Sequence, residues 1–168
     1  MLHGWDSFYL LIGSAAAALI GLLFVVATLT AGREASSASR GAHLYMTPTV
    51  FHLALVLLIS ALALTPGVTA PIAGAALGAA ALIGFVYAAM ICIEFLRGKA
   101  PEVPHWSDVW YYAVIPAAIY LGFGAMAILF WRALAWAPYG AALMVVVLLL
   151  TAIRNAWDLV TWLAPRRG

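Results

Sequence analysis

The stretch FYLLIGSAAAALIGLLFVVATLTA, residues 8–31, contains no charged side chain and is dominated by alanine and leucine. An apolar run of about 18 residues or more predicts a membrane-spanning helix, because about 20 residues are needed to cross a hydrocarbon core of about 30 Å. The residues before it contain no lysine or arginine, and the run is longer than a signal-peptide core of about 7–15 residues. We therefore interpret this stretch as a retained first span.

The composition extends this interpretation to the whole chain. Of its 168 residues, 67% are hydrophobic and only 8% are charged, whereas soluble domains carry about 25% charged residues. The net charge of +2 comes from dispersed basic residues rather than from a basic patch, so we expect no nucleic-acid partner. The single cysteine, Cys92, excludes an intrachain disulfide. The main partner expected for this chain is the lipid bilayer.

Four further apolar segments follow the first, each bounded by turn or charge signals. Pro48 and Pro138 precede two of them, which suits the first turn of a helix, where the missing N–H has no partner to lose. The connection around Pro66 is the shortest, and it predicts that the second and third segments pack as an antiparallel hairpin. We predict an all-α fold in a single transmembrane domain over residues 1–168, with five spans at about 8–31, 48–66, 71–96, 108–132 and 138–163.

The distribution of positive charge predicts the orientation of the bundle. With five spans, seven of the eight lysines and arginines fall on one side of the membrane, and Arg132 alone falls on the other. Because cytoplasmic loops are enriched in these residues, we expect the N-terminus outside and the C-terminus in the cytoplasm. Tryptophans and tyrosines gather near the predicted span ends, as is typical of residues at a membrane–water interface.

Small residues form stripes at four-residue spacing on two of the predicted spans. Span one carries Gly13, Ala17 and Gly21, and span three carries Gly74 and Gly78. Such stripes let helix backbones approach closely where lipid provides no hydrophobic drive. They predict either packing between the helices of one chain or a homo-oligomer built around the first span.

Pro116 lies inside the fourth predicted span. Because proline lacks an N–H and clashes with the carbonyl four residues earlier, we expect a kinked helix in which the Tyr112 carbonyl loses its donor. Membrane helices tolerate proline more often than soluble helices do, so a structural kink is the expected role.

The polar residues of the predicted spans gather on the side predicted to face the cytoplasm. Arg154 and Asp158 are four apart, and Asn155 and Asp158 are three apart, so all three share one helical face. A cytoplasm-facing polar pocket forms if this face meets those of the other spans. Alternatively, Arg154 and Asp158 only pair with each other, since a charge inside a bilayer costs at least ~2.5–3.5 kcal/mol. The candidate pocket residues are His52, Glu94, Asp108, Tyr112, Arg154, Asn155 and Asp158.

Several classes of chemistry find no support in the sequence. The only lysine, Lys99, lies in a predicted loop, so a retinal-type Schiff base has no candidate residue within the bundle. The zinc-protease, hydrolase and phosphate-loop motifs are absent, so we assign no catalytic residues and expect no cofactor. A metal site built from His52, Glu94 and Asp158 is left open by ligand type.

Three stretches together resemble a family of small polytopic bacterial inner-membrane proteins, some of which are described as membrane-protease modulators. They are FYLLIGSAAAALIGLLFVVATLTAGRE (8–34), HWSDVWYYAVIPAAIY (105–120) and IRNAWDLVTW (153–162). The resemblance implies a location in the bacterial inner membrane. It implies no particular activity and no catalytic or cofactor-binding residues.

Three classes of function are compatible with these observations. The first is a small channel or transporter, in which the polar pocket handles protons, ions or a small polar solute. The alternative is a non-enzymatic accessory or regulatory subunit of a larger membrane complex, whose small-residue faces contact its partner. A membrane-embedded enzyme, or a metal or cofactor binder, is the least favoured class.

Overall fold

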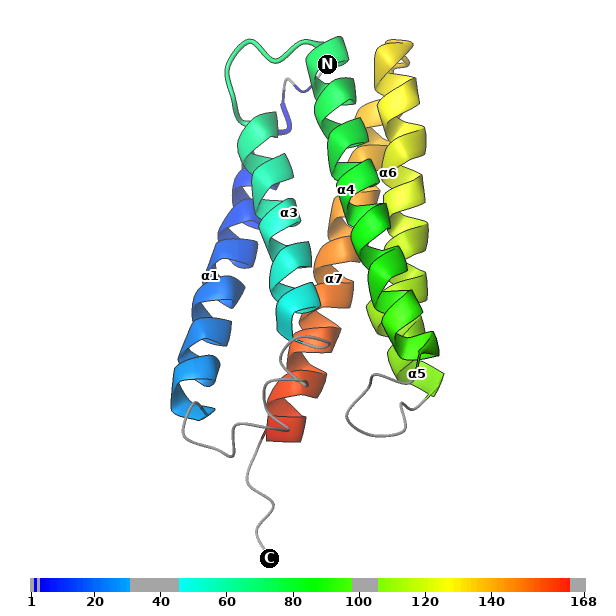
Figure 1. Ribbon diagram of the computed structural model, residues 1–168. Helices are drawn as coiled ribbons and strands as arrows, with labels where there is room; N and C mark the ends of the chain where they lie inside the picture. Colours follow the sequence, from blue (N-terminus) through cyan, green and yellow to red (C-terminus); the bar gives the residue numbers. More distant parts are fainter. Residues whose placement is uncertain (1, 3, 31–45, 98–105, 164–168) are drawn as a thin grey trace, which may run out of the picture.

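The computed structural model describes residues 2, 4–30, 46–97 and 106–163, and all regular secondary structure in these ranges is helical (Figure 1). Residues 106–131 form one continuous helical rod that contains a π turn, and each of the other helices is a rod by itself. Each rod begins and ends within three residues of a predicted span. The elements are α1 (Asp6–Thr30), α3 (Thr47–Ala63), α4 (Ala70–Leu96), α5 (Trp106–Val109), η2 (Trp110–Val114), α6 (Ile115–Trp131) and α7 (Ala137–Leu163).

The rods run alternately up and down the bundle, and they pack as two pairs joined by α7 (Figure 1). The first pair is α1 with α3, the second is α4 with α6, and α7 contacts members of both. Helices α3 and α4 are consecutive, but each makes its main contacts elsewhere. The hairpin expected from their short connection is therefore not the main packing unit.

Four of the helices are long and apolar enough to cross a membrane, and α3 is shorter. Its 17 residues span about 26 Å at 1.5 Å per residue, slightly less than a hydrocarbon core of about 30 Å. The helix ends at Ala63, three residues before the predicted boundary, because Pro66 disfavours the helical conformation of Thr65. Gly67 then turns the chain with a φ of +77°.

Glycines explain why the helices pair in this way. A Cβ atom at Gly74 would lie 3.0 Å from the carbonyl oxygen of Ala127, so the backbones of α4 and α6 are in contact there. A Cβ atom at Gly13 would lie 3.0 Å from the Cβ of Ser60, so the missing side chain also lets α1 approach α3 closely. At Gly78 the added atom would meet the Ala127 Cβ at an ordinary 3.7 Å. These glycines therefore serve packing within the chain.

The rest of the stripe on α1 has no such use within the described residues. Ala17 is exposed at the edge of the α1–α3 groove, and an added Cβ at the exposed Gly21 would have no described atom within 4 Å. The stripe thus divides between Gly13, which packs against α3, and two exposed positions, of which Gly21 has no described neighbour.

Candidate functional site

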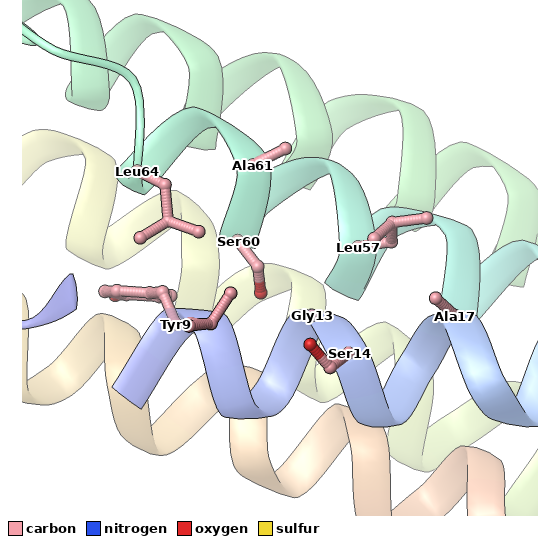
Figure 2. Close-up of a pocket in the computed structure, with 9 residues that line it drawn as sticks. Tyr9, Gly13, Ser14, Ala17, Leu57, Ser60, Ala61 and Leu64 are labelled. Carbon is pink, nitrogen blue, oxygen red and sulfur yellow. The ribbon is translucent and has the colours of Figure 1, made fainter. Parts of the chain in front are cut away.

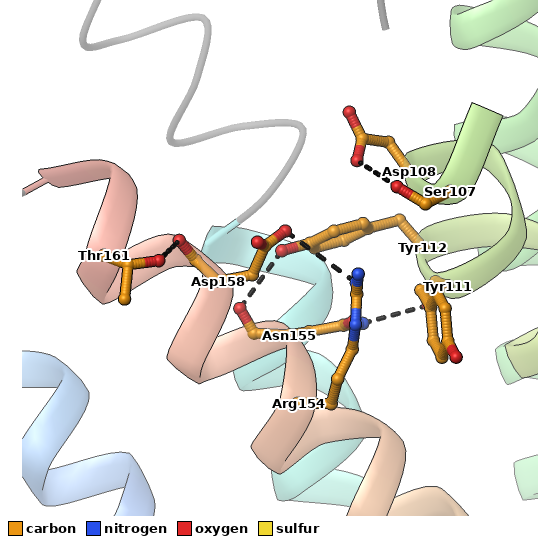
Figure 3. Close-up of polar contacts among 8 residues, drawn as sticks. All are labelled: Ser107, Asp108, Tyr111, Tyr112, Arg154, Asn155, Asp158 and Thr161. Carbon is orange, nitrogen blue, oxygen red and sulfur yellow. Dashed lines mark hydrogen bonds and ion pairs between the residues drawn. The ribbon is translucent and has the colours of Figure 1, made fainter. Parts of the chain in front are cut away.

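Asn155 links α7 to the π turn η2 (Figure 3). Its side chain is completely buried, and its Nδ2 donates to the carbonyl oxygen of Tyr111 at 3.0 Å. The Tyr112 hydroxyl in turn donates to the Asn155 backbone carbonyl at 3.1 Å. Two consecutive tyrosines of one rod are thereby bonded to a single residue of another.

Pro116 explains why the Tyr111 carbonyl is free to accept this bond. The N–H of Ile115 bonds to the carbonyl of Trp110, five residues earlier, as in a π turn. In the same register the Tyr111 carbonyl would receive the N–H of residue 116, but proline has none. The amide of Asn155 supplies the missing donor. The sequence predicted that the proline withholds a donor from the Tyr112 carbonyl, whereas in the π register it withholds one from the Tyr111 carbonyl.

Arg154 lies at the edge of this network. Its Nη1 donates to the Asn155 Oδ1 at 3.3 Å and lies 3.8 Å from the Asp158 Oδ2. The guanidinium also covers the Tyr111 ring, with 3.8 Å between its Cζ and the ring centroid. The side chains of Arg154 and Asp158 are 35% and 46% exposed, so their ion pair contributes at most about 1 kcal/mol.

The two other carboxylates predicted for this pocket lie on neighbouring segments. Asp108 is in α5, where the Ser107 hydroxyl donates to its Oδ1 at 3.4 Å. Glu94 is half-buried near the end of α4, one residue before Phe95, which packs on Tyr112 and η2. The structure therefore brings Tyr112, Arg154, Asn155 and Asp158 into one bonded network at the predicted cytoplasmic end, with Asp108 and Glu94 on the adjoining segments.

His52 takes part in a different cluster. It is completely buried, and its Nδ1 lies 2.6 Å from the Tyr120 hydroxyl oxygen. Tyr120 is about 20 Å along the rod from Trp106, at 1.5 Å per residue, and so lies near mid-bundle. The predicted pocket residues are thus divided in two, with His52 nearer mid-bundle than the network of Asn155.

Aromatic packing from three helices encloses the His52–Tyr120 pair. The Tyr120 ring fills a notch at Gly84 of α4, where an added Cβ would overlap the ring. Tyr87, three residues further along α4, packs against Phe51 in a tilted arrangement with ring centroids 4.3 Å apart. We call His52, Tyr87 and Tyr120 the histidine centre.

Two polar atoms of the histidine centre are buried without a hydrogen-bond partner among the described residues: the His52 Nε2 and the Tyr87 hydroxyl. Buried polar atoms are nearly always bonded, so each exception needs an explanation. Tyr87 and Tyr120 were not in the set of candidate pocket residues. The sequence did offer a signal for both, because Tyr87 is seven residues before Glu94 and Tyr120 is eight residues after Tyr112, so each shares a helical face with a member of that set.

A groove of about 220 Å³ lies between α1 and α3 (Figure 2). Ser60 forms part of its wall, and this buried hydroxyl also has no hydrogen-bond partner among the described residues. The remaining lining is almost wholly apolar or small, including Leu57, Ala61 and Ala17. The groove faces outward and lies apart from the histidine centre.

Metal binding finds no support in the described part of the chain. No group of three or more histidine, cysteine, aspartate or glutamate side chains there is close enough to hold an ion. The metal site considered for His52, Glu94 and Asp158 is therefore not formed.

Comparison with known proteins adds no family to these observations. No model of a protein family, no curated protein and no solved structure matches the chain.

Proposed function

We propose that this protein transfers protons across the bacterial inner membrane through the histidine centre, with its N-terminus outside and its C-terminus in the cytoplasm. The observation that carries the proposal is the buried Nε2 of His52, which has no partner among the described residues. Leaving a buried donor or acceptor unbonded costs about 1–3 kcal/mol. Ionisable residues inside a membrane bundle commonly belong to proton or ion pathways.

The chemistry of the pair suits a proton relay. A neutral imidazole has one N–H donor and one bare nitrogen, and a tyrosine hydroxyl both donates and accepts. A proton taken up on the bare nitrogen of His52 gives an imidazolium, which releases a proton from the other nitrogen. With Tyr120 bonded at Nδ1 and Nε2 available, the two nitrogens provide separate entry and exit points.

Packing favours a proton over a larger cargo. Pockets for small molecules usually measure about 300–1,000 Å³. His52 has no exposed surface, and the Tyr120 ring is pressed into the notch at Gly84. A solute of several atoms would need these helices to separate, whereas a proton needs only a donor and an acceptor at hydrogen-bond distance; Tyr120 provides this at Nδ1, and a water molecule would have to provide it at Nε2.

Proton flux into liposomes tests the proposal. Purified protein is reconstituted with a trapped pH-sensitive dye, and acidification is followed after a membrane potential is imposed. We expect flux from the wild type, the rate of empty liposomes from His52→Gln, and reduced flux from Tyr120→Phe. Tyr139→Phe is the matched control, because it removes the same hydroxyl from a side chain that is 67% exposed. Wild-type flux from His52→Gln, or no flux from folded wild type, would contradict the proposal.

A second candidate function is that of a non-enzymatic accessory subunit, either in a homo-oligomer or in a larger membrane complex. The exposed Ala17 and Gly21 favour it, because small residues at this spacing support close helix contacts in lipid. Chemical cross-linking in native membranes would detect such an assembly. Gly21→Leu should abolish the cross-linked species if α1 forms the contact, and unchanged cross-linking would count against that interface.

A further inference from the structure

Whether η2 is a π turn or an α turn, which we call the register of this rod, determines which way Tyr120 points. The π turn closes over five residues where an α turn closes over four, so it holds one residue more. One residue of an α-helix corresponds to a rotation of about 100°, from 3.6 residues per turn. If η2 became α-helical, α6 would rotate by about this angle relative to α5.

Two tyrosines, one within η2 and one in α6, anchor this rod in the present register. Tyr112 and Tyr120 are each only 1% exposed, with Tyr112 bonded to α7 and Tyr120 bonded to His52 of α3. A rotation of about 100° between them could not keep both side chains buried. It would also remove the Tyr120 ring from the notch at Gly84.

Pro116 and Asn155 together favour the π register. The proline leaves one carbonyl without a donor in either register: that of Tyr112 in an α turn, and that of Tyr111 in the π turn. The Asn155 amide bonds to the Tyr111 carbonyl at 3.0 Å. In the π register the Tyr111 carbonyl therefore has a donor, and this is also the register that directs Tyr120 towards His52.

We propose that Asn155 is a positioning residue for the histidine centre: by bonding to Tyr111 it maintains the π turn, and the π turn keeps Tyr120 against His52. The proposal deepens the proposed proton transfer and rests on it for its consequence in flux. The contact between Tyr120 and His52 is a structural property, however, and can be measured whether or not protons move.

The imidazole ¹⁵N resonances of His52 provide that measurement. The full chain is labelled at histidine and reconstituted in lipid, and the His52 signals are assigned by their loss in His52→Gln. Tyr120→Phe gives the positions expected when the hydrogen bond to Nδ1 is absent. We expect Asn155→Leu to shift the Nδ1 resonance to the Tyr120→Phe position, and its proton flux to fall to the Tyr120→Phe level.

Thr151→Val is the matched control. Thr151 is buried one turn before Asn155 on the same helix, but its hydroxyl donates to Val147 of its own helix. The His52 resonances should stay at their wild-type positions in this variant. Asn155→Ser and Asn155→Ala replace Asn155→Leu if that variant does not fold.

The two proposals fail in different ways. Wild-type His52 resonances in every folded Asn155 variant, or an equal shift in Thr151→Val, would overturn the positioning role. Absence of flux from the wild type would overturn the proposed function while the resonances still decide the role of Asn155.

Discussion

Replacing Asn155 by alanine should destabilise the bundle by about 1–3 kcal/mol, chiefly through the Tyr111 carbonyl. The substitution removes the donor at 3.0 Å and leaves a carbonyl between α7 and η2 that Pro116 cannot satisfy. Hydrogen bonds between membrane helices average about 0.6 kcal/mol and reach about 1.7 kcal/mol, and an orphaned buried carbonyl adds a desolvation cost. The bond from Arg154 at 3.3 Å involves a partly exposed side chain and adds little.

The same reasoning predicts that Pro116→Ala partly suppresses this loss. Alanine restores an N–H at residue 116, which can donate to the Tyr111 carbonyl in the π register or to the Tyr112 carbonyl in an α register. In the π register the Tyr111 carbonyl receives this N–H, and in an α register it receives the N–H of Ile115, so in either case it has a donor. We expect a coupling of about 1 kcal/mol between the two sites, above the additivity error of about 0.3–0.5 kcal/mol.

A double-mutant cycle measures this coupling. The free energies of unfolding of the wild type, both single variants and the double variant are obtained from denaturant titrations in mixed micelles, followed by helicity. The effect of losing a proline on the unfolded chain is common to both arms and cancels. A parallel cycle of Thr151→Val with Pro116→Ala should be additive. Additivity in the Asn155 cycle as well would refute the idea that the amide replaces the missing N–H.

Two further predictions concern packing and charge. Gly84→Ala should destabilise the bundle by about 1–3 kcal/mol, because its Cβ would overlap the Tyr120 ring, whereas Gly21→Ala should change stability by less than about 0.5 kcal/mol; equal effects in thermal unfolding would contradict this packing. Arg154→Gln should cost less than about 1 kcal/mol, because Arg154 and Asp158 are 35% and 46% exposed, and a larger loss in the same assay would show a more buried ion pair.

The sequence alone determined the class of the fold and the helix boundaries. Whether a segment can cross a bilayer depends on its own length and polarity, so runs such as 8–31 could be recognised one at a time. Prolines near the segment starts and at the 64–69 turn bounded the helices to within three residues. The polar residues of α7 were recognised for the same reason, since charges are conspicuous in an apolar chain.

Only the tertiary structure decided which faces meet. Lipid is as apolar as the interior of a membrane bundle, so hydrophobicity along a helix says little about which side is buried. The contact between His52 and Tyr120 joins residues 68 apart in the sequence. The other polar residues of the spans predicted neither this contact nor its position near mid-bundle. Likewise, Pro116 predicted a carbonyl without a backbone donor, but the sequence did not show that the amide of Asn155, 44 residues after Tyr111, bonds to the Tyr111 carbonyl. Register and pairing depend on donors supplied by other helices, which local sequence patterns do not contain.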